Sequence, residues 1–315
     1  MKRVLSITLL TASIISTSFF IFSCTQKKNV QDGKITVTAT IFPQYDFVRA
    51  IAKDKVNLLM LLPPAQESHS FEPTPRDIIT IQNSNIFIYS GGESDVWVSR
   101  ILQSTDSSNM ITISLIDTVD AVEEEIVEGM EEAEEEEEVI AYDEHVWTSP
   151  KNAVYIVQTI TETLCAADTA NADFYRQNAE NYILQLEKLD AEFKNVVDNA
   201  KRKTIIFADR FPFRYFADRY GLSYFAAFPG CSTETEPSAA TVAFLIDKIK
   251  SEHIPVVFHI ELSNERMADT IAEETGAKKL LLHSGHNVSK KDFENGITYI
   301  DIMQNNLENL RISLQ

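Results

Sequence analysis

Histidine is the side chain whose positions in this sequence point most directly to chemistry. His69 follows the apolar run VNLLMLL, His145 lies in YDEHVW after an acidic tract, and His283 and His286 lie in LLLHSGHN. In each case we expect the imidazole at the end of a buried strand, where open α/β sheets bind their ligands. Neutral imidazole is the commonest protein metal ligand near pH 7. The sequence therefore predicts a metal site assembled from several strand ends.

The elements that would position these histidines follow an alternating pattern. Apolar runs such as ITVTATIF, NIFIYSGG, TIIFAD and KKLLLH alternate with segments of helix length, which favours parallel sheets. Residues 172–200 contain no Gly or Pro and repeat apolar side chains every three or four residues, which predicts a helix roughly 40 Å long. We predict an α/β fold with two lobes, each a central, mostly parallel sheet flanked by helices. The N-terminal lobe spans 34–170, one long rigid linking helix spans 171–200, and the C-terminal lobe spans 201–315.

The charge of the chain is concentrated in one tract. The formal net charge is −19, and residues 123–138 read EEEIVEGMEEAEEEEE, which supplies eleven glutamates. A run of like charges without aromatic residues is typical of a solvated, mobile loop, and we expect residues 121–141 to form one. Nucleic acid is excluded as a partner because no basic stripe is visible, whereas cations are natural guests.

The N-terminus has the pattern of a targeting segment. Lys2 and Arg3 precede an apolar stretch, and Ser23 directly precedes Cys24. This pattern resembles a bacterial lipoprotein signal peptide, with residues 1–23 removed, Cys24 lipidated and 24–33 serving as a tether to the membrane. An uncleaved membrane anchor is the alternative. Both place the body of the protein outside the cytoplasm.

The two remaining cysteines give weaker signals. Cys165 lies in a helical pattern and is expected to be a small buried apolar residue. Cys231 lies in a predicted loop, where it is a minor candidate for a thiol ligand. A disulfide between them is compatible with an oxidising compartment.

Several longer segments resemble one known family. VTATIFPQYDFVRAIA, LLPPAQESHSFEPTPRDI, IYSGGESDVWV, DEHVWTSPKNA and YFADRYGL are together similar to the solute-binding lipoproteins of bacterial zinc and manganese ABC importers. The likeness runs in order from about Ile35 to the C-terminus. It implies two α/β lobes joined by one long helix and a single divalent cation held in the cleft. It also implies delivery of that cation to a membrane permease driven by an ATPase.

The resemblance assigns the ligands position by position. His69 matches the first ligand of the family and His145 the second. The third ligand position, a His or Glu in most members, carries Arg210 here, and a guanidinium has no lone pair to offer. The fourth position, usually an acid, aligns with His283. This chain therefore departs from the usual four-ligand set.

Other side chains are candidates to complete the set. His286 lies three residues beyond His283 in a loop that contains Gly285, so both imidazoles can turn toward one ion. His259 and Glu261 alternate in VVFHIE and share one face of a strand end. Asp209, directly before Arg210, is a weaker candidate. Arg210 itself is expected to form a structural salt bridge, or else to pair with a carboxylate ligand or an anion bound in the cleft.

These observations predict a monomeric, extracytoplasmic receptor that binds zinc, with manganese next, for an ABC permease. A histidine-rich set favours zinc because manganese sites rely more on carboxylates. One alternative is a receptor for a chelated or anion-associated metal. A second is a zinc hydrolase with Glu261 as its base, although the chain has no HExxH, GxSxG or P-loop motif. A third alternative is adhesion by an exposed lipoprotein, which is compatible with metal capture.

Overall fold

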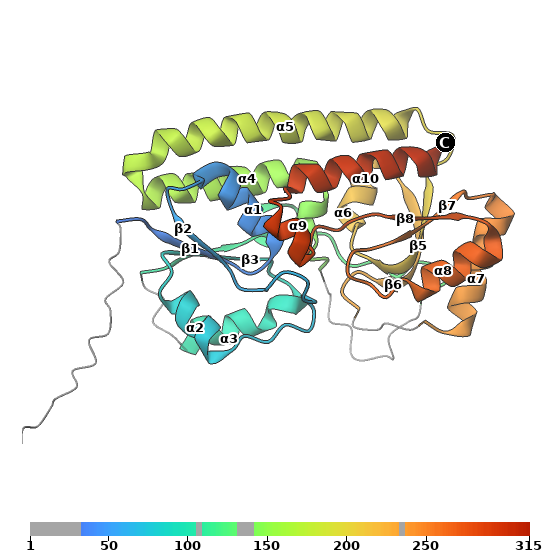
Figure 1. The fold of residues 1–315 in the computed structure, drawn as a ribbon, viewed down its shortest axis with the longest axis horizontal. Helices are drawn as coiled ribbons and strands as arrows, with labels where there is room; N and C mark the ends of the chain where they lie inside the picture. The colour runs from blue at the N-terminus through green and yellow to red at the C-terminus, as the bar shows by residue number, and fades with distance from the viewer. Residues whose placement is uncertain (1–32, 105–108, 131–141, 233–236) are drawn as a thin grey trace, which may run out of the picture. The chain divides into compact units, whose positions relative to one another are not determined.

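Two four-stranded parallel sheets form the framework of the protein, which was analysed as a computed structural model (Figure 1). The structure describes residues 33–104, 109–130, 142–232 and 237–315. The first sheet has the order β2-β1-β3-β4, with β1 Thr36–Ala39, β2 Asn57–Met60, β3 Ile86–Tyr89 and β4 Ile111–Ser114. The second has the order β6-β5-β7-β8, with β5 Thr204–Phe211, β6 Ser223–Pro229, β7 Val256–His259 and β8 Lys278–Leu281. The predicted fold class is confirmed.

Helices cover both faces of each sheet, as buried parallel sheets require (Figure 1). The first lobe contains α1 Phe42–Ala52, α2 Pro75–Gln82, α3 Val96–Ser104 and α4 Pro150–Ala167. The second lobe contains α6 Arg214–Tyr220, α7 Ala239–Glu252 and α8 Arg266–Thr275, and the chain ends with α9 Lys290–Glu294 and α10 Tyr299–Leu314. No helix among the described residues is both long enough and apolar enough to cross a membrane.

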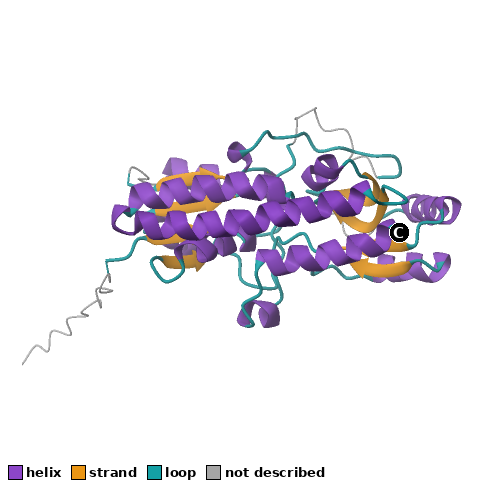
Figure 2. Cartoon of the chain, turned by 90° about the horizontal axis from the view of Figure 1, so that it is seen from above, coloured by secondary structure: helices purple, strands orange, loops and turns teal. Residues whose placement is uncertain are grey.

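One long helix joins the lobes, as the sequence predicts. Helix α5 spans Ala172–Asp198 and buries one face through Tyr175, Ala179, Tyr182, Leu186, Leu189, Phe193 and Val197. It packs against α1 and α4 over the first sheet and against α6 and α10 over the second. Figure 2, which views the molecule from above, shows long helices side by side in front of the strands. One continuous hydrophobic core includes Phe47 of the first lobe, Leu186 of α5 and Phe207 of the second lobe.

The C-terminal segment does not belong to the second lobe alone. After β8 the chain returns to the first lobe, where the Ala65 N–H donates to the Val288 carbonyl at 2.8 Å. The Tyr299 hydroxyl donates to the Trp147 carbonyl at 2.6 Å. The predicted boundary at 201–315 therefore includes a stretch that ties the two lobes together. The periodicity of apolar residues reports local structure and cannot predict hydrogen bonds between such distant segments.

Part of the acidic tract, for which a solvated loop at 121–141 is expected, contacts the second lobe. The Glu124 carboxylate accepts the Cys231 N–H at 2.8 Å, and Glu125 pairs with Arg214 at 2.9 Å. Met130 is buried at 8% exposure. Donors of the second lobe therefore meet Glu124 and Glu125, whereas Glu123, Ile126 and Glu128 are exposed, as expected of a solvated loop. Residues 131–141 of the tract lie outside the described residues.

Two predictions about the cysteines and the N-terminus have different outcomes. Cys165 and Cys231 are both free and buried, so no disulfide joins them. The predicted signal peptide 1–23, the lipidation site Cys24 and nearly all of the tether lie outside the described residues.

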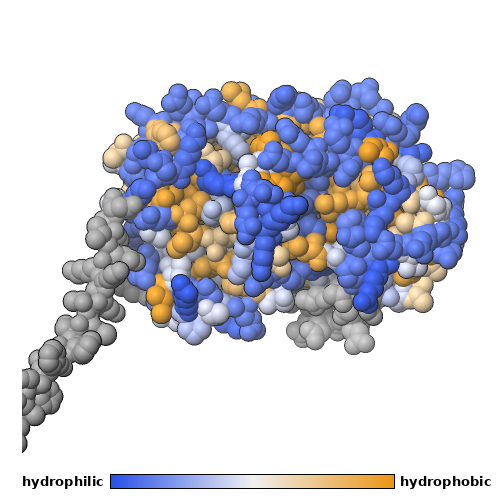
Figure 3. All heavy atoms as spheres, viewed as in Figure 1, coloured by the Kyte–Doolittle hydropathy of each residue, from blue (hydrophilic) through white to orange (hydrophobic). Residues whose placement is uncertain are grey.

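In Figure 3, hydrophilic residues cover most of the visible face, with apolar ones scattered between them.

Candidate metal centre

His69 lies in the loop between β2 and α2, and its hydrogen bonds fix which ring nitrogen is free. Its Nδ1 lies 2.9 Å from the Ser94 hydroxyl oxygen. The Ser94 hydroxyl donates its one proton to Glu144, so the serine oxygen must accept from His69 Nδ1–H. That tautomer leaves Nε2 with a free lone pair. Burial, assisted by the positive charges of His145 and Arg210, lowers the pKa of His69 to about 3, so the ring is neutral at pH 7.

His145 lies just before the short helix η3 Val146–Thr148 and is fully buried. The Asp143 carboxylate accepts both the backbone N–H of His145, at 2.7 Å, and its Nδ1–H, at 2.9 Å. The ring is thereby held with Nε2 pointing away from Asp143, and this buried nitrogen has no hydrogen-bond partner. Burial alone would lower the pKa of His145, but the charge and hydrogen bond of Asp143 raise it above the ordinary value. A buried nitrogen left unpaired is costly, which indicates a missing ligand.

His286 lies in the loop after β8, where Gly285 adopts a φ of 78° that disfavours other residues. Glu261 organises this loop by accepting the backbone N–H groups of Ser284, at 2.7 Å, and of His286, at 3.1 Å. The indole N–H of Trp147 donates to the Ser284 carbonyl at 2.9 Å. Burial, together with the positive charges of His145 and Arg210, lowers the pKa of His286 well below its usual value. The loop therefore presents a neutral imidazole.

Glu144 is the acidic neighbour of these rings and is absent from the ligands predicted from the sequence. Its side chain is fully buried and accepts the Ser94 backbone N–H at 3.0 Å. A Cβ at Gly92 would lie 2.6 Å from the Glu144 Cβ, so only glycine leaves room for this carboxylate. Burial raises the pKa of Glu144. The position of Glu144 directly before His145 in DEHVW was the sequence feature that could have indicated this carboxylate as a ligand. The many acidic residues just before it made one more glutamate hard to single out.

These four side chains form one group of potential donors. The ligating atoms of His69, Glu144, His145 and His286 all lie within 4.8 Å of one another. The His286 ring centroid lies 4.9 Å from that of His69 and 4.8 Å from that of His145. Three imidazoles and one carboxylate suit a tetrahedral zinc ion. The orphaned Nε2 of His145 and the neutral rings beside it fit a cation held here.

The other predicted candidates lie elsewhere or have other roles. The His283 Nδ1 accepts the Gly285 N–H at 3.0 Å and lies 3.4 Å from Glu261, so this ring is outside the donor group. The His259 Nδ1 pairs with the Ile260 carbonyl at 3.0 Å, and Asp209 accepts the Ile260 N–H. The structure thus brings together three of the predicted ligands, His69, His145 and His286. It leaves out His283, His259, Glu261 and Asp209 because loop backbone groups engage them.

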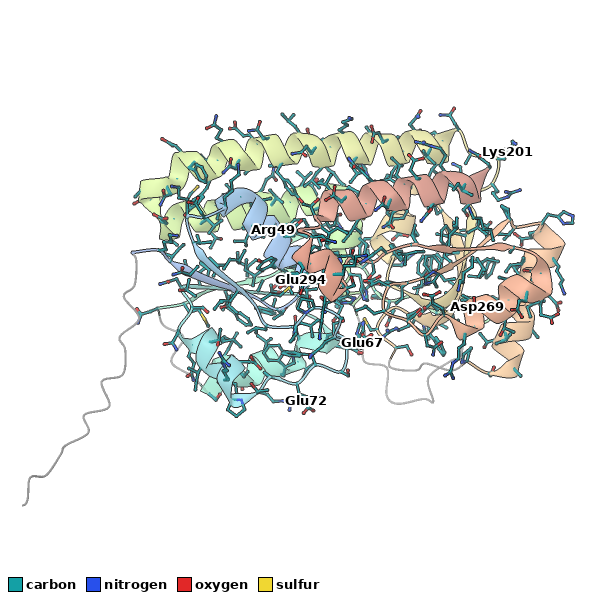
Figure 4. The ribbon with its side chains drawn as sticks, viewed as in Figure 1. Arg49, Glu67, Glu72, Lys201, Asp269 and Glu294 are labelled. Carbon is teal, nitrogen blue, oxygen red and sulfur yellow. The ribbon has the colours of Figure 1, made fainter. Side chains whose placement is uncertain are left out.

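Arg210, at the end of β5, faces the first lobe instead of coordinating anything. Its guanidinium contacts the Glu67 carboxylate at 3.0 and 3.4 Å and donates to the Ser232 carbonyl at 3.3 Å. Glu67 lies between the lobes in Figure 4. The opening beside the histidines is lined by both of these residues, together with His69 and His286. Of the expected roles for Arg210, the salt bridge is the one that the structure contains.

The fold and the donor group define a two-lobed α/β binding protein whose potential ligands lie between the lobes. The chain matches, over residues 37–312, the family described as ZnuA, zinc-uptake complex component A, periplasmic. It belongs to this family, which agrees with the resemblance found in the sequence.

The relatives share this description. The chain is 34% identical over 287 residues to the high-affinity zinc uptake system protein ZnuA of Bacillus subtilis, covering 89% of this chain and 88% of that protein. It is 30% identical over 308 residues to the zinc-binding lipoprotein AdcA of Streptococcus pneumoniae, covering 97% of this chain. It spans about 60% of the length of AdcA.

Solved structures agree on the fold. The metal-dependent lipoprotein YcdH of Bacillus subtilis superposes with a TM-score of 0.77 at 33% identity, covering 90% of this chain and all of that one. The Zn(II)-bound ZnuA-like domain of Streptococcus pneumoniae AdcA gives a TM-score of 0.74 at 29% identity, covering 90% of this chain and 99% of that domain.

Proposed function

We propose that this protein is an extracytoplasmic receptor that binds one divalent transition-metal ion and delivers it to an ABC permease and its ATPase. The observation that carries the proposal is the Nε2 of His145, which is buried without a partner among the donors of His69, His286 and Glu144. An ion at this position satisfies all four side chains at once. The relatives are named as zinc uptake and zinc-binding proteins, which supports the same cargo.

Zinc is the preferred ion in this proposal, and manganese is second. Three imidazoles with one carboxylate match the nitrogen-rich, four-coordinate geometry that zinc adopts. Manganese favours more oxygen ligands and a higher coordination number. The outer hydrogen bonds support the same assignment. Asp143 and Ser94 accept the Nδ1–H groups of His145 and His69, and metal-binding histidines generally donate their second ring N–H to such an acceptor.

Two alternatives have less support. A zinc hydrolase needs an open coordination position and a free general base, whereas four protein donors are available here and Glu261 is engaged by backbone N–H groups. A receptor for a chelated or anion-associated metal would need a free cationic group, and the Arg210 guanidinium is already paired with Glu67. We therefore propose binding of the bare ion and no catalysis.

The location of the receptor is part of the proposal. Lipidation of Cys24 would hold the body at a membrane surface through the tether 24–33, within reach of the permease. We propose that it acts as a monomer, since each chain provides a complete set of four donors. Mass spectrometry of the membrane-extracted protein tests the anchor, and the mass in solution of the chain from residue 25 tests the monomer.

Calorimetric titration of metal-stripped protein with zinc and with manganese tests the function. The expected result is one site per chain, with zinc bound more tightly than about 1 µM and more tightly than manganese. His145→Ala should abolish tight binding, whereas His253→Asn, at the exposed C-cap of α7, should bind like the wild type. Binding weaker than micromolar for both metals would refute the proposal.

A further inference from the structure

One ion pair spans the opening of the metal centre. Glu67 comes from the loop after β2 in the first lobe and Arg210 from the end of β5 in the second, and we call them the cleft pair. The Arg210 side chain is 12% exposed and that of Glu67 is 41% exposed. Both line the opening that leads to His69 and His286. An ion that passes through this opening must pass the cleft pair.

The loop that carries Glu67 is held firmly at its base and lightly at its tip. The buried Asn287 side-chain amide donates to the Pro63 carbonyl at 2.8 Å and to the Gln66 carbonyl at 2.9 Å. Ala65, between them, adopts a φ of 67°. Beyond this base, the Glu67 side chain is half exposed and contacts Arg210 and the His69 N–H, the latter at 3.3 Å. The tip can therefore move while the base of the loop remains fixed.

The rest of the protein offers little freedom for a larger opening. The hydrophobic core runs without interruption from the first lobe through α5 into the second. The segment after β8 is also hydrogen-bonded to the first lobe, through Val288 to Ala65 and through Tyr299 to Trp147. Packed interiors resist continuous deformation, so access to a buried site must come from the weakest local contact. At this opening that contact is the partly exposed cleft pair.

We propose that the cleft pair is a gate over the metal centre, whose breaking sets how fast the ion enters and leaves. Arg210 stands at the position that the family resemblance assigns to a ligand, and here it holds the loop of His69 across the opening. This inference rests on the proposed function. Its consequence is kinetic: a gate changes the rates of association and dissociation together and leaves the dissociation constant nearly unchanged.

A pair acting only through its charges would behave differently. Glu67→Gln alone would then weaken the binding of a dication, and Arg210→Gln alone would strengthen it, because they remove charges of opposite sign near the site. The double variant Glu67→Gln/Arg210→Gln keeps the net charge and removes the gate. It is therefore the decisive variant.

Stopped-flow mixing with zinc and with a chromophoric chelator measures the two rates. For the double variant we expect both rates to rise about fivefold, the scale of one partly exposed ion pair, with less than a twofold change in the dissociation constant. Arg210→Lys, which keeps the charge but loses the planar fork, should also raise both rates. The matched control is Glu308→Gln/Arg311→Gln, which removes an exposed pair on α10, also without changing the net charge.

The outcomes separate the gate from the proposed function. If the double variant exchanges zinc at the wild-type rates, or if the single variants only shift affinity in opposite directions, the gate is wrong while zinc binding stands. If the wild-type protein binds neither zinc nor manganese, the proposed function fails and the gate with it. A rise of both rates in the double variant, absent from the α10 control, supports the gate.

Discussion

The choice between His283 and His286 gives the most direct test of the site. The Nε2 of His286 lies 4.0 Å from the Glu144 carboxylate, and its ring is in edge contact with those of His69 and His145. The ring of His283 instead accepts the Gly285 N–H at 3.0 Å. His286→Ala should therefore remove a zinc ligand, and His283→Ala should remove only a loop contact.

The expected magnitudes differ widely. Zinc sites with four protein ligands bind with roughly 10 to 16 kcal/mol, so one ligand of four contributes about 3 kcal/mol. His286→Ala should thus weaken zinc binding about 100-fold or more. His283→Ala should change it by no more than about threefold, as for substitutions away from the ligands.

Competition against a chelator of known affinity at pH 7 measures both variants. His253→Asn controls for the loss of any histidine, since His253 is exposed at the end of α7. Thermal unfolding of the metal-free forms must first show that each variant is folded. Equal losses for the two variants, or wild-type binding by His286→Ala, would refute the assignment of His286 to the donor group.

Three further predictions concern the surroundings of the site. Asp143→Asn weakens the hold on the His145 ring and should reduce zinc affinity about 10-fold, measured by the same competition, whereas unchanged affinity would contradict the orienting role. Gly92→Ala should displace Glu144 and destabilise the metal-free protein by about 1 to 3 kcal/mol in urea unfolding, and wild-type stability would show that the site tolerates a methyl group. Burial and the charge of Glu144 raise the pKa of Asp95 in the folded protein to about 7. The stabilisation that the folded state gains by holding this proton is full below the unfolded pKa of 3.8 and is lost as the pH rises toward 7. Between pH 5 and 8 the metal-free wild type should therefore lose about 3 kcal/mol relative to Asp95→Asn, and parallel stability curves for the two proteins would refute the shift.

The sequence determined the architecture because the relevant signals are local. Alternating apolar runs predicted both parallel sheets, and the run without Gly or Pro predicted α5 to within a few residues of Ala172–Asp198. His69 and His145 stand in motifs that could be recognised without coordinates. The family, too, followed from motifs in the order of the chain.

Only the tertiary structure decided which side chains meet. The family alignment placed His283 at the fourth ligand position and left His286 as a further candidate, whereas the turn at Gly285, held by Glu261 and Trp147, directs His286 toward the other donors. Glu144 joins the group because Gly92 leaves it space. Arg210 pairs with Glu67, 143 residues away, which no local pattern encodes. Spacing along the chain fixes the periodicity of an element, whereas the direction of a side chain in a loop depends on contacts from remote segments.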